Sequence, residues 1–441
     1  ISLKVAMQQP YLPVNPPSPK SGHPTKHWLT ILQFVLSLLG MLVLWGVALM
    51  TTLVGLLGGI QTSAGTAAST PLFITAASAA AGGLLLLPSV VLSLRRIISQ
   101  TATAPARFSK AGWLSFIIVA LPFVLVLGNY AATKPGSAWV LLPPLHVLAV
   151  LLPIVWLVFL AVRGLPIGSR QRSWGVFDSG LMLGPIIIIT LELISLAILI
   201  ALSLIYISSS PELSSGIATL AEELSSSTPS SDTIIQLIAP YLTSPALITA
   251  AIAFIALLVP LVEEAVKPIG VWLLLRRSLS PAEGFAAGAL SGAGFAIFES
   301  LAASSTGEGW LILVAGRIGT AAVHILTTAL MGWALVLARS QKRYLRLVGT
   351  YLGVVLIHGA WNALTMFAAI YGIRNDMNLG VSEILMQISE FTPYILAIMA
   401  LLIFAALLWV NRHLRRSQDV VEGATQQDEQ NSIVEQSRGV L

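Results

Sequence analysis

The sequence predicts an all-α fold, a polytopic transmembrane helical bundle of about ten spans with its N- and C-termini in the cytoplasm. Only 10% of the 441 residues are charged and 56% are apolar, whereas soluble domains usually carry about 25% charged residues. Apolar runs of roughly 20 residues recur along the chain, enough to cross a ~30 Å hydrocarbon core. The runs are unbroken rather than alternating, so they predict helices and not the strands of a membrane barrel.

The predicted spans are ten apolar runs separated by short polar segments. They fall near residues 28–59, 69–94, 111–132, 138–162, 176–207, 246–275, 283–304, 310–338, 346–371 and 392–411. Lys and Arg gather in the segments after the second, fourth, sixth, eighth and tenth runs, and the other connections are poor in them. Because basic residues accumulate in cytoplasmic loops, this alternation predicts that both termini are cytoplasmic.

The segments outside the spans divide the chain into regions of different composition. The Pro-rich segment at the start and the acidic segment at the end both predict disordered cytoplasmic tails. The predicted regions are a tail at 1–27, a five-span membrane region of unknown role at 28–207, a Ser-rich acidic extracytoplasmic loop at 208–245, a four-helix core at 246–371, a final span at 392–411 and a tail at 412–441. The chain has no cysteine, which excludes disulfides, thiolate catalysis and cysteine-based zinc sites.

Ionisable residues inside the membrane are expensive, at about 2.5–3.5 kcal/mol each on insertion scales. Most spans avoid this cost, but four consecutive spans do not. Their polar residues are Glu263, Glu264 and Lys267 in the sixth span, Glu299 in the seventh, Arg317 and His324 in the eighth, and His358 and Asn362 in the ninth. Such a concentration in one half of the chain predicts a functional centre, whereas the lone polar residues Glu192 and His146 predict structural roles.

Helical spacing predicts that these side chains meet. At ~100° per residue, Lys267 projects between Glu263 and Glu264, so the three form one polar face. Arg317 and His324 are seven residues apart and share a face, and His358 and Asn362 share one at i, i+4. At a ~1.5 Å rise per residue, the carboxylates, imidazoles and amide lie ~18–24 Å from the cytoplasmic ends of their spans.

A stripe of small residues on the seventh span predicts close helix packing on one side. Gly284, Gly288 and Gly292 recur every fourth residue, a spacing that lets a neighbouring helix approach closely. Glu299 follows Gly292 by seven residues and therefore points toward this packed side. We expect Arg317 to neutralise a carboxylate rather than to take part in chemistry.

Two carboxylates, two histidines and an amide in a water-excluding bundle suit hydrolysis. A buried carboxylate can take a proton from water, and His or Asn can donate hydrogen bonds to an oxyanion. The same groups could hold zinc, with Glu263, Glu299, His324 and His358 as the candidate ligands. The HExxH pattern of common metalloproteases is absent from the sequence.

Four motifs, in order on successive spans, resemble the PrsW family of intramembrane proteases within the CAAX-protease-like membrane superfamily. They are Glu263-Glu264-Ala265-Val266-Lys267, Phe295 to Glu299, His324, and His358 to Asn362. The resemblance covers about residues 255–370 and implies hydrolysis of membrane-anchored proteins by a glutamate-activated water. The catalytic set it implies is Glu263, Glu264, Glu299, His324, His358 and Asn362, supported by the charges of Lys267 and Arg317.

The resemblance also implies the molecular setting. We expect an integral protein of a prokaryotic plasma membrane whose partners are the lipid bilayer and a membrane-anchored substrate, with no nucleic acid. No cofactor is required in the glutamate–water mechanism, and zinc is the alternative that the candidate ligands leave open. Glu263, Glu264 and Lys267 could instead form a buried ion pair that only fixes helix packing.

Two other functions remain open on the sequence. One is a non-catalytic membrane scaffold or accessory subunit of the same superfamily, which would keep the helix arrangement without the chemistry. The other is a proton-coupled transporter, because buried carboxylates and histidines also form proton relays. The transporter is less favoured, since the polar residues gather in one half of the chain and no inverted repeat is evident.

Overall fold

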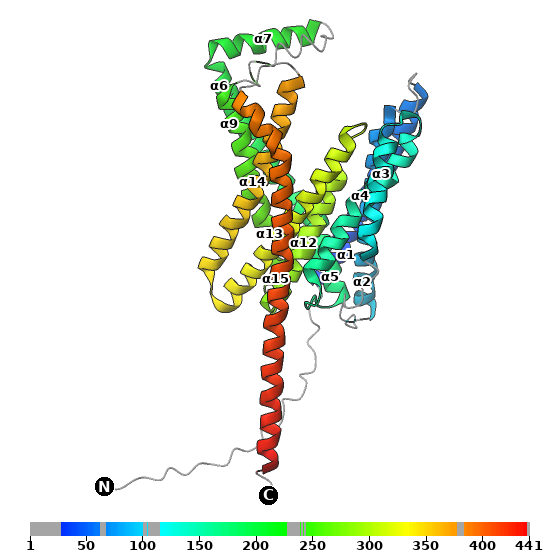
Figure 1. Ribbon diagram of the computed structural model, residues 1–441. Helices are drawn as coiled ribbons and strands as arrows, with labels where there is room; N and C mark the ends of the chain where they lie inside the picture. Colours follow the sequence, from blue (N-terminus) through cyan, green and yellow to red (C-terminus); the bar gives the residue numbers. More distant parts are fainter. Residues whose placement is uncertain are drawn as a thin grey trace, which may run out of the picture.

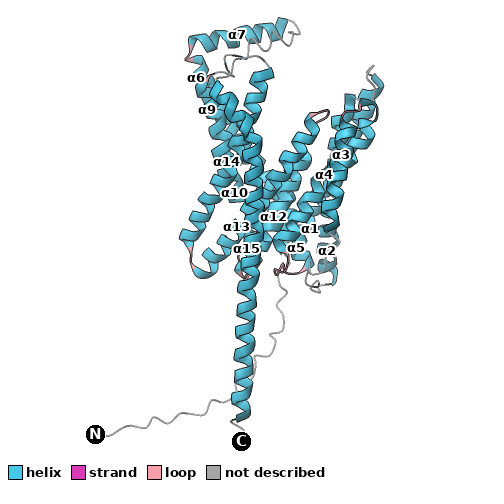
Figure 2. Ribbon diagram, viewed as in Figure 1, coloured by secondary structure: helices cyan, strands magenta, loops and turns pink. Residues whose placement is uncertain are grey.

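The computed structural model describes residues 28–61, 68–99, 104, 115–226, 239, 241, 244–376 and 383–438. The described residues form helices and turns without a strand ladder, as Figure 2 shows. The elements are α1 (Trp28–Gln61), α2 (Thr70–Ser99), α3 (Ser115–Ala132), α4 (Pro135–Val162), α5 (Arg170–Asp178), η3 (Ser179–Leu183), α6 (Gly184–Ser208), α7 (Pro211–Ser226), α9 (Pro245–Ala253), η4 (Phe254–Leu258), α10 (Val259–Val266), α11 (Ile269–Leu274), α12 (Pro281–Ala302), α13 (Gly309–Gln341), α14 (Tyr344–Asp376) and α15 (Glu383–Arg438).

The predicted all-α membrane bundle is confirmed. Among the described residues, nine helices or helix runs are long and apolar enough to cross a membrane. The remaining predicted span, at 111–132, corresponds to α3, whose apolar stretch over Val119–Ala132 is shorter. The cytoplasmic placement of both termini stays a prediction, and the tail predicted at 1–27 lies outside the described residues.

Two of the spans contain a π-helical turn where the chain approaches the polar centre. η3 joins α5 to α6, and η4 joins α9 to α10. The second of these spans breaks again at Lys267–Pro268, where α10 gives way to α11. Proline cannot donate a backbone hydrogen bond, which explains the break after Lys267. Single π-helical turns inside α-helices frequently mark functional sites. The carboxylates of α10 lie between the π-helical turn η4 and the helix break at Lys267–Pro268.

α12 and α13 form the centre of the bundle, between the helices α1–α5 on one side and α6, α9 and α14 on the other (Figure 1). The predicted glycine stripe of α12 packs directly on the backbone of α13. A Cβ atom added at Gly288 would lie 2.3 Å from the Thr328 carbonyl oxygen, and one at Gly292 would lie 2.6 Å from that of His324. Only glycine permits this approach, so the stripe brings His324 against the helix that carries Glu299.

Two segments outside the predicted spans contain helices among the described residues. The loop predicted at 208–245 contains α7, which lies across the ends of α6 and α9 (Figure 1). Its Leu213, Ile217 and Leu220 recur at helical spacing, a period that the Ser-rich composition concealed. The tail predicted at 412–441 continues α15 to Arg438. It has no proline and many Gln and Glu residues, which extend an existing helix without a new nucleation step.

Candidate hydrolytic centre

α10 places two carboxylates beside the ammonium group that ends it. Lys267 Nζ lies 2.6 Å from Glu263 Oε2 and 2.9 Å from Glu264 Oε1, and its side chain is fully buried. The helix break at Lys267 is supported from α12, because the Ser291 hydroxyl donates to the Lys267 carbonyl oxygen at 2.6 Å. The three charged residues therefore form the single polar face that their spacing predicts.

The two histidines contact this face from α13 and α14. Lys267 Nζ lies 2.8 Å from His324 Nδ1, and His358 Nδ1 lies 2.9 Å from Glu264 Oε1. A carboxylate only accepts hydrogen bonds, so His358 Nδ1 donates to Glu264. The other ring nitrogen, Nε2, lies 3.8 Å from Glu263 Oε2. His358 therefore lies against both carboxylates of α10.

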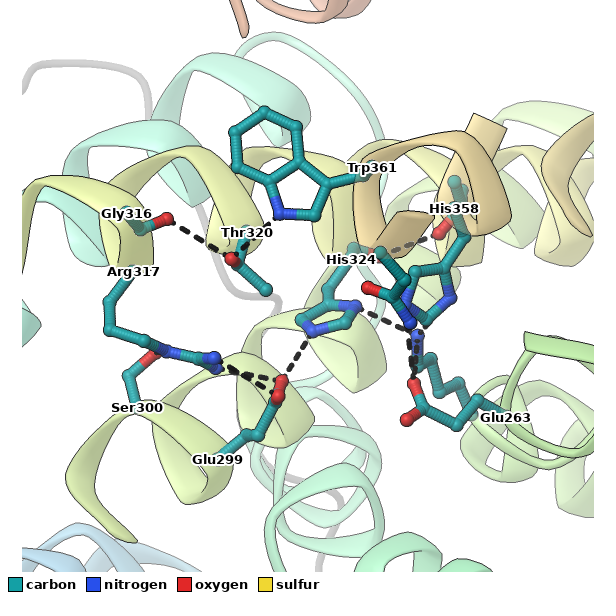
Figure 3. Close-up of polar contacts among 12 residues, drawn as sticks. Glu263, Glu299, Ser300, Gly316, Arg317, Thr320, His324, His358 and Trp361 are labelled. Atoms are coloured by element: carbon teal, nitrogen blue, oxygen red, sulfur yellow. Dashed lines mark hydrogen bonds and ion pairs between the residues drawn. The ribbon is translucent and has the colours of Figure 1, made fainter. Parts of the chain in front are cut away.

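Glu299 fixes His324 from the opposite side of the ring. Its Oε2 atom lies 2.5 Å from His324 Nε2, and Arg317 Nη1 donates to its Oε1 at 3.0 Å (Figure 3). Arg317 also donates to the Ser300 hydroxyl at 3.2 Å. Arg317 thus neutralises a carboxylate, and the chain Arg317–Glu299–His324 sets which nitrogen of the imidazole faces Lys267.

We expected Asn362 to donate a hydrogen bond to an oxyanion, whereas in the structure it bonds to the protein backbone. Its Nδ2 atom donates to the Ile255 carbonyl oxygen at 3.1 Å, inside the π-helical turn η4. The turn also packs closely on α14, since a Cβ atom at Gly359 would lie 2.2 Å from the Ala256 carbonyl oxygen. Asn362 therefore holds η4 in place, and one of its two N–H groups is used for this.

A cavity of about 1550 Å³ opens on one side of the centre. Its wall includes Glu263, Glu299, Arg317, His358 and Asn362, whereas the rest of the lining is largely apolar. Glu264, Lys267 and His324 do not belong to the wall and lie behind it. The adjacent carboxylates of α10 consequently differ in access: Glu263 reaches the cavity and Glu264 does not.

The sequence reasoning missed Glu192, which it assigned a structural role. This α6 side chain lines the same cavity as Glu263. The signal was present, because Glu192 is an isolated carboxylate in a strongly apolar span, but nothing in the sequence indicates which helix it faces. His146, the other lone polar residue, lies elsewhere and accepts a hydrogen bond from Trp310 Nε1 at 3.3 Å.

One group of side chains has the composition of a metal site. Glu263, His324 and His358 each offer one ligand atom, and these atoms lie within 4.8 Å of one another. Glu299, the fourth predicted ligand, bonds instead to the outer nitrogen of His324. A carboxylate in that position usually orients a metal-binding histidine rather than binding the metal itself.

The fold and the centre define a polytopic membrane protein with buried carboxylate and imidazole groups at the wall of an apolar cavity. The family model described as PrsW family intramembrane metalloprotease matches residues 217–408. The match, which covers less than half of the 441 residues, supports an intramembrane protease. Comparisons with curated proteins and with solved structures give no significant match. The matched region includes α10 to α14 and leaves out α1 to α6.

Proposed function

We propose that the chain is an endopeptidase that hydrolyses membrane-anchored proteins, with Glu263 taking the proton from the attacking water. The observation that carries this proposal is the position of Glu263, whose carboxylate faces both the large cavity and the Lys267 ammonium. In the reaction, the water oxygen attacks the scissile carbonyl carbon while its proton moves to Glu263. The peptide C–N bond then breaks, and Glu263 returns the proton to the leaving amine.

The neighbouring groups hold Glu263 and the developing charge in place. Lys267 is shared between Glu263 and Glu264, which prevents the two carboxylates from approaching as unpaired like charges. Glu264 is buried behind the wall and orients His358 through the bond to Nδ1. Asn362 keeps a second N–H group beside the cavity, and this group is our candidate donor to the oxyanion.

The cavity supports a peptide segment as substrate. Small-molecule sites usually occupy about 300–1,000 Å³, and this cavity is larger, at about 1550 Å³. Its apolar lining comes from several spans, including Leu121 of α3, Trp156 of α4, Met366 of α14 and Phe404 of α15. An apolar segment of a membrane-anchored protein matches such a wall, and a prokaryotic plasma membrane as its location is part of the same proposal.

The donor set also fits a divalent metal such as zinc, which one carboxylate and two imidazoles commonly bind. Glu263, His324 and His358 would hold the ion, and Glu299 would orient His324. A bound zinc ion would polarise the scissile carbonyl as a Lewis acid. The Lys267 ammonium contacts Glu263 at 2.6 Å and His324 at 2.8 Å, so it has to turn away from these ligand atoms when a metal binds.

The test is cleavage of candidate single-span membrane proteins by the purified chain. Glu263→Gln keeps the shape of the side chain and removes its basicity, so turnover should fall by about 10²–10⁴ while the protein stays folded. Glu264→Gln should cause a smaller loss. Arg276→Ala, an exposed change just beyond α11, is the matched control and should leave turnover unchanged.

Full cleavage by both glutamine variants would show that the catalytic assignment is wrong. Treatment with a membrane-permeant chelator distinguishes a metal-dependent mechanism from one that uses Glu263 and water alone. Loss of cleavage that returns with zinc would make the centre metal-dependent. Cleavage that persists in chelator would assign hydrolysis to Glu263 and water alone.

A further inference from the structure

A small pocket lies between α1, α5 and α11, at the end of the bundle where the basic segments gather, and its wall shares no residue with the hydrolytic cavity. Its volume is about 110 Å³. Three arginines from distant parts of the chain contribute to the wall: Arg96 near the end of α2, Arg172 in the first turn of α5 and Arg277 just after α11. Basic pockets between membrane helices commonly receive lipid headgroups, so the convergence of these arginines indicates a phosphate site.

The arginines keep most of their positive charge available for a ligand. Arg172 Nη2 lies 2.6 Å from Glu283 Oε1, whereas the described residues provide no ion pair for Arg96 or Arg277. A planar guanidinium group offers several N–H donors and matches the oxygens of a phosphate. A phosphate group in this pocket would therefore meet two cations that no described carboxylate neutralises.

Asp178 adds a negative charge to the same pocket. Its side chain lines the pocket and is 4% exposed. Its Oδ2 atom accepts hydrogen bonds from the Ser37 and Ser89 hydroxyls, whereas its buried Oδ1 atom has no partner among the described residues. Buried polar atoms are normally satisfied by a hydrogen bond. A ligand that fills this pocket should therefore carry an N–H or O–H donor as well as a phosphate.

The spacing of the charges and the narrowness of the pocket restrict the ligand further. Arg172 and Asp178 are six residues apart on α5, ~9 Å along the helix axis, so a phosphate and a donor joined by a short linker can contact both. Gln33 and Gln171 bond to each other at 2.9 Å in the wall, which leaves little width. A primary ammonium group is small and cationic, and its charge-assisted hydrogen bond to a carboxylate is stronger than that of a neutral hydroxyl.

The rest of the wall is apolar, which favours a lipid over a soluble phosphate compound. Its apolar residues include Leu32 and Leu36 of α1, Met182 and Leu183 of η3, and Leu273 of α11. Acyl chains attached to a headgroup in this pocket would lie against such side chains.

We propose that this pocket binds the headgroup of an aminophospholipid such as phosphatidylethanolamine. The phosphate contacts Arg96, Arg172 and Arg277, and the primary ammonium donates a hydrogen bond to Asp178 Oδ1. The bound lipid fixes the packing of α1 against α5 and α11. Lipid binding at this pocket is independent of the catalytic role of Glu263.

Native mass spectrometry of the delipidated full chain in detergent tests the proposal, with lipids that have identical acyl chains. Phosphatidylethanolamine should bind about 10-fold more tightly than phosphatidylcholine, whose quaternary ammonium has no N–H donor. It should also bind more tightly than phosphatidylglycerol, whose headgroup carries no cation to meet Asp178. Soluble phosphoethanolamine lacks acyl chains and should bind about 10-fold more weakly than the lipid.

Substitutions in the pocket test the two contacts separately. Asp178→Asn keeps the size of the side chain and should remove most of the preference for phosphatidylethanolamine over phosphatidylcholine. Arg96→Gln and Arg277→Gln should each weaken the binding of both lipids about 10-fold and leave the preference in place. Arg95→Gln and Arg276→Gln change exposed neighbours that do not line the pocket, so these matched controls should leave both affinities unchanged.

Equal affinities for the ethanolamine and choline lipids, or a preference that persists in Asp178→Asn, would overturn the proposal. Tighter binding of phosphatidylglycerol would overturn it in favour of an anionic lipid. Equally tight binding of phosphoethanolamine would overturn it in favour of a soluble ligand. If Asp178→Asn is not recovered folded, the arginine variants decide, and lipid affinities that match those of the two controls would overturn it.

Discussion

Among the described residues, carboxylates are buried in two clusters, and the two clusters are built differently. In the first five spans, Asp178 accepts hydrogen bonds from the hydroxyls of Ser37 and Ser89. In the family-matched region, Glu263 and Glu264 face an ammonium group and two imidazoles. The Asp178 cluster borders a pocket of about 110 Å³, whereas the Glu263 cluster borders one of about 1550 Å³. Neutral hydroxyl partners in a tight pocket are suited to fixing helix packing.

Comparing the Asp178 and Glu263 clusters shows which features distinguish a chemical centre from a structural cluster in a membrane bundle. Burial is common to both, since Asp178 is 4% exposed and Glu263 is 6% exposed. The distinguishing features are cationic or titratable partners and access to a space large enough for a substrate. Substitutions at Lys267, Glu299 and Asp178 test this distinction.

The largest change in stability is expected at Lys267. Lys267→Met keeps an unbranched chain of similar length but leaves two buried carboxylates without their cation. Removal of one partner from a buried ion pair typically costs about 3–5 kcal/mol. The unfolding free energy in detergent should fall by this amount, and adding Glu264→Gln should restore part of it. A loss no greater than that of an Asp178 variant would contradict the distinction between the clusters.

A smaller effect on catalysis is expected at Glu299. Glu299→Gln weakens the bond that fixes the His324 ring, so turnover should fall about 10- to 100-fold, as it does when outer partners of catalytic histidines are removed. The measurement is kcat on the same single-span substrate. Glu308→Gln, exposed at the start of α13, is the control. Equal activity of both variants would show that the Arg317–Glu299–His324 chain is not needed for turnover.

The smallest effect is expected at Asp178. Asp178→Asn keeps the size of the side chain and can still accept from Ser37, but it replaces a charge-assisted hydrogen bond with a neutral one. The difference is about 1 kcal/mol of unfolding free energy, with cleavage per folded molecule unchanged. A loss of cleavage without a loss of stability would assign the first five spans a direct part in the reaction.

Much of the fold follows from local properties of the chain. Hydropathy located the membrane helices, because a run that crosses the bilayer must satisfy its own backbone hydrogen bonds whatever surrounds it. Composition was a poorer guide outside the membrane, where α7 and the end of α15 form helices in segments predicted to be irregular. Membrane burial constrains a helix strongly, whereas polar segments are compatible with several conformations.

The contacts within single helices follow from the amino-acid sequence. Lys267 meets Glu263 and Glu264 because residues three and four apart share a helix face, and the glycines of α12 allow close packing wherever a partner helix lies. Which partners those faces meet depends on how the helices pack against one another. The tertiary structure places Glu263 at the cavity and Glu264 behind it, directs Asn362 to the carbonyl of Ile255, and brings Glu192 of α6 into the wall of the same cavity. Helical periodicity relates side chains along one axis, whereas contacts between helices depend on rotations and offsets that no single span encodes.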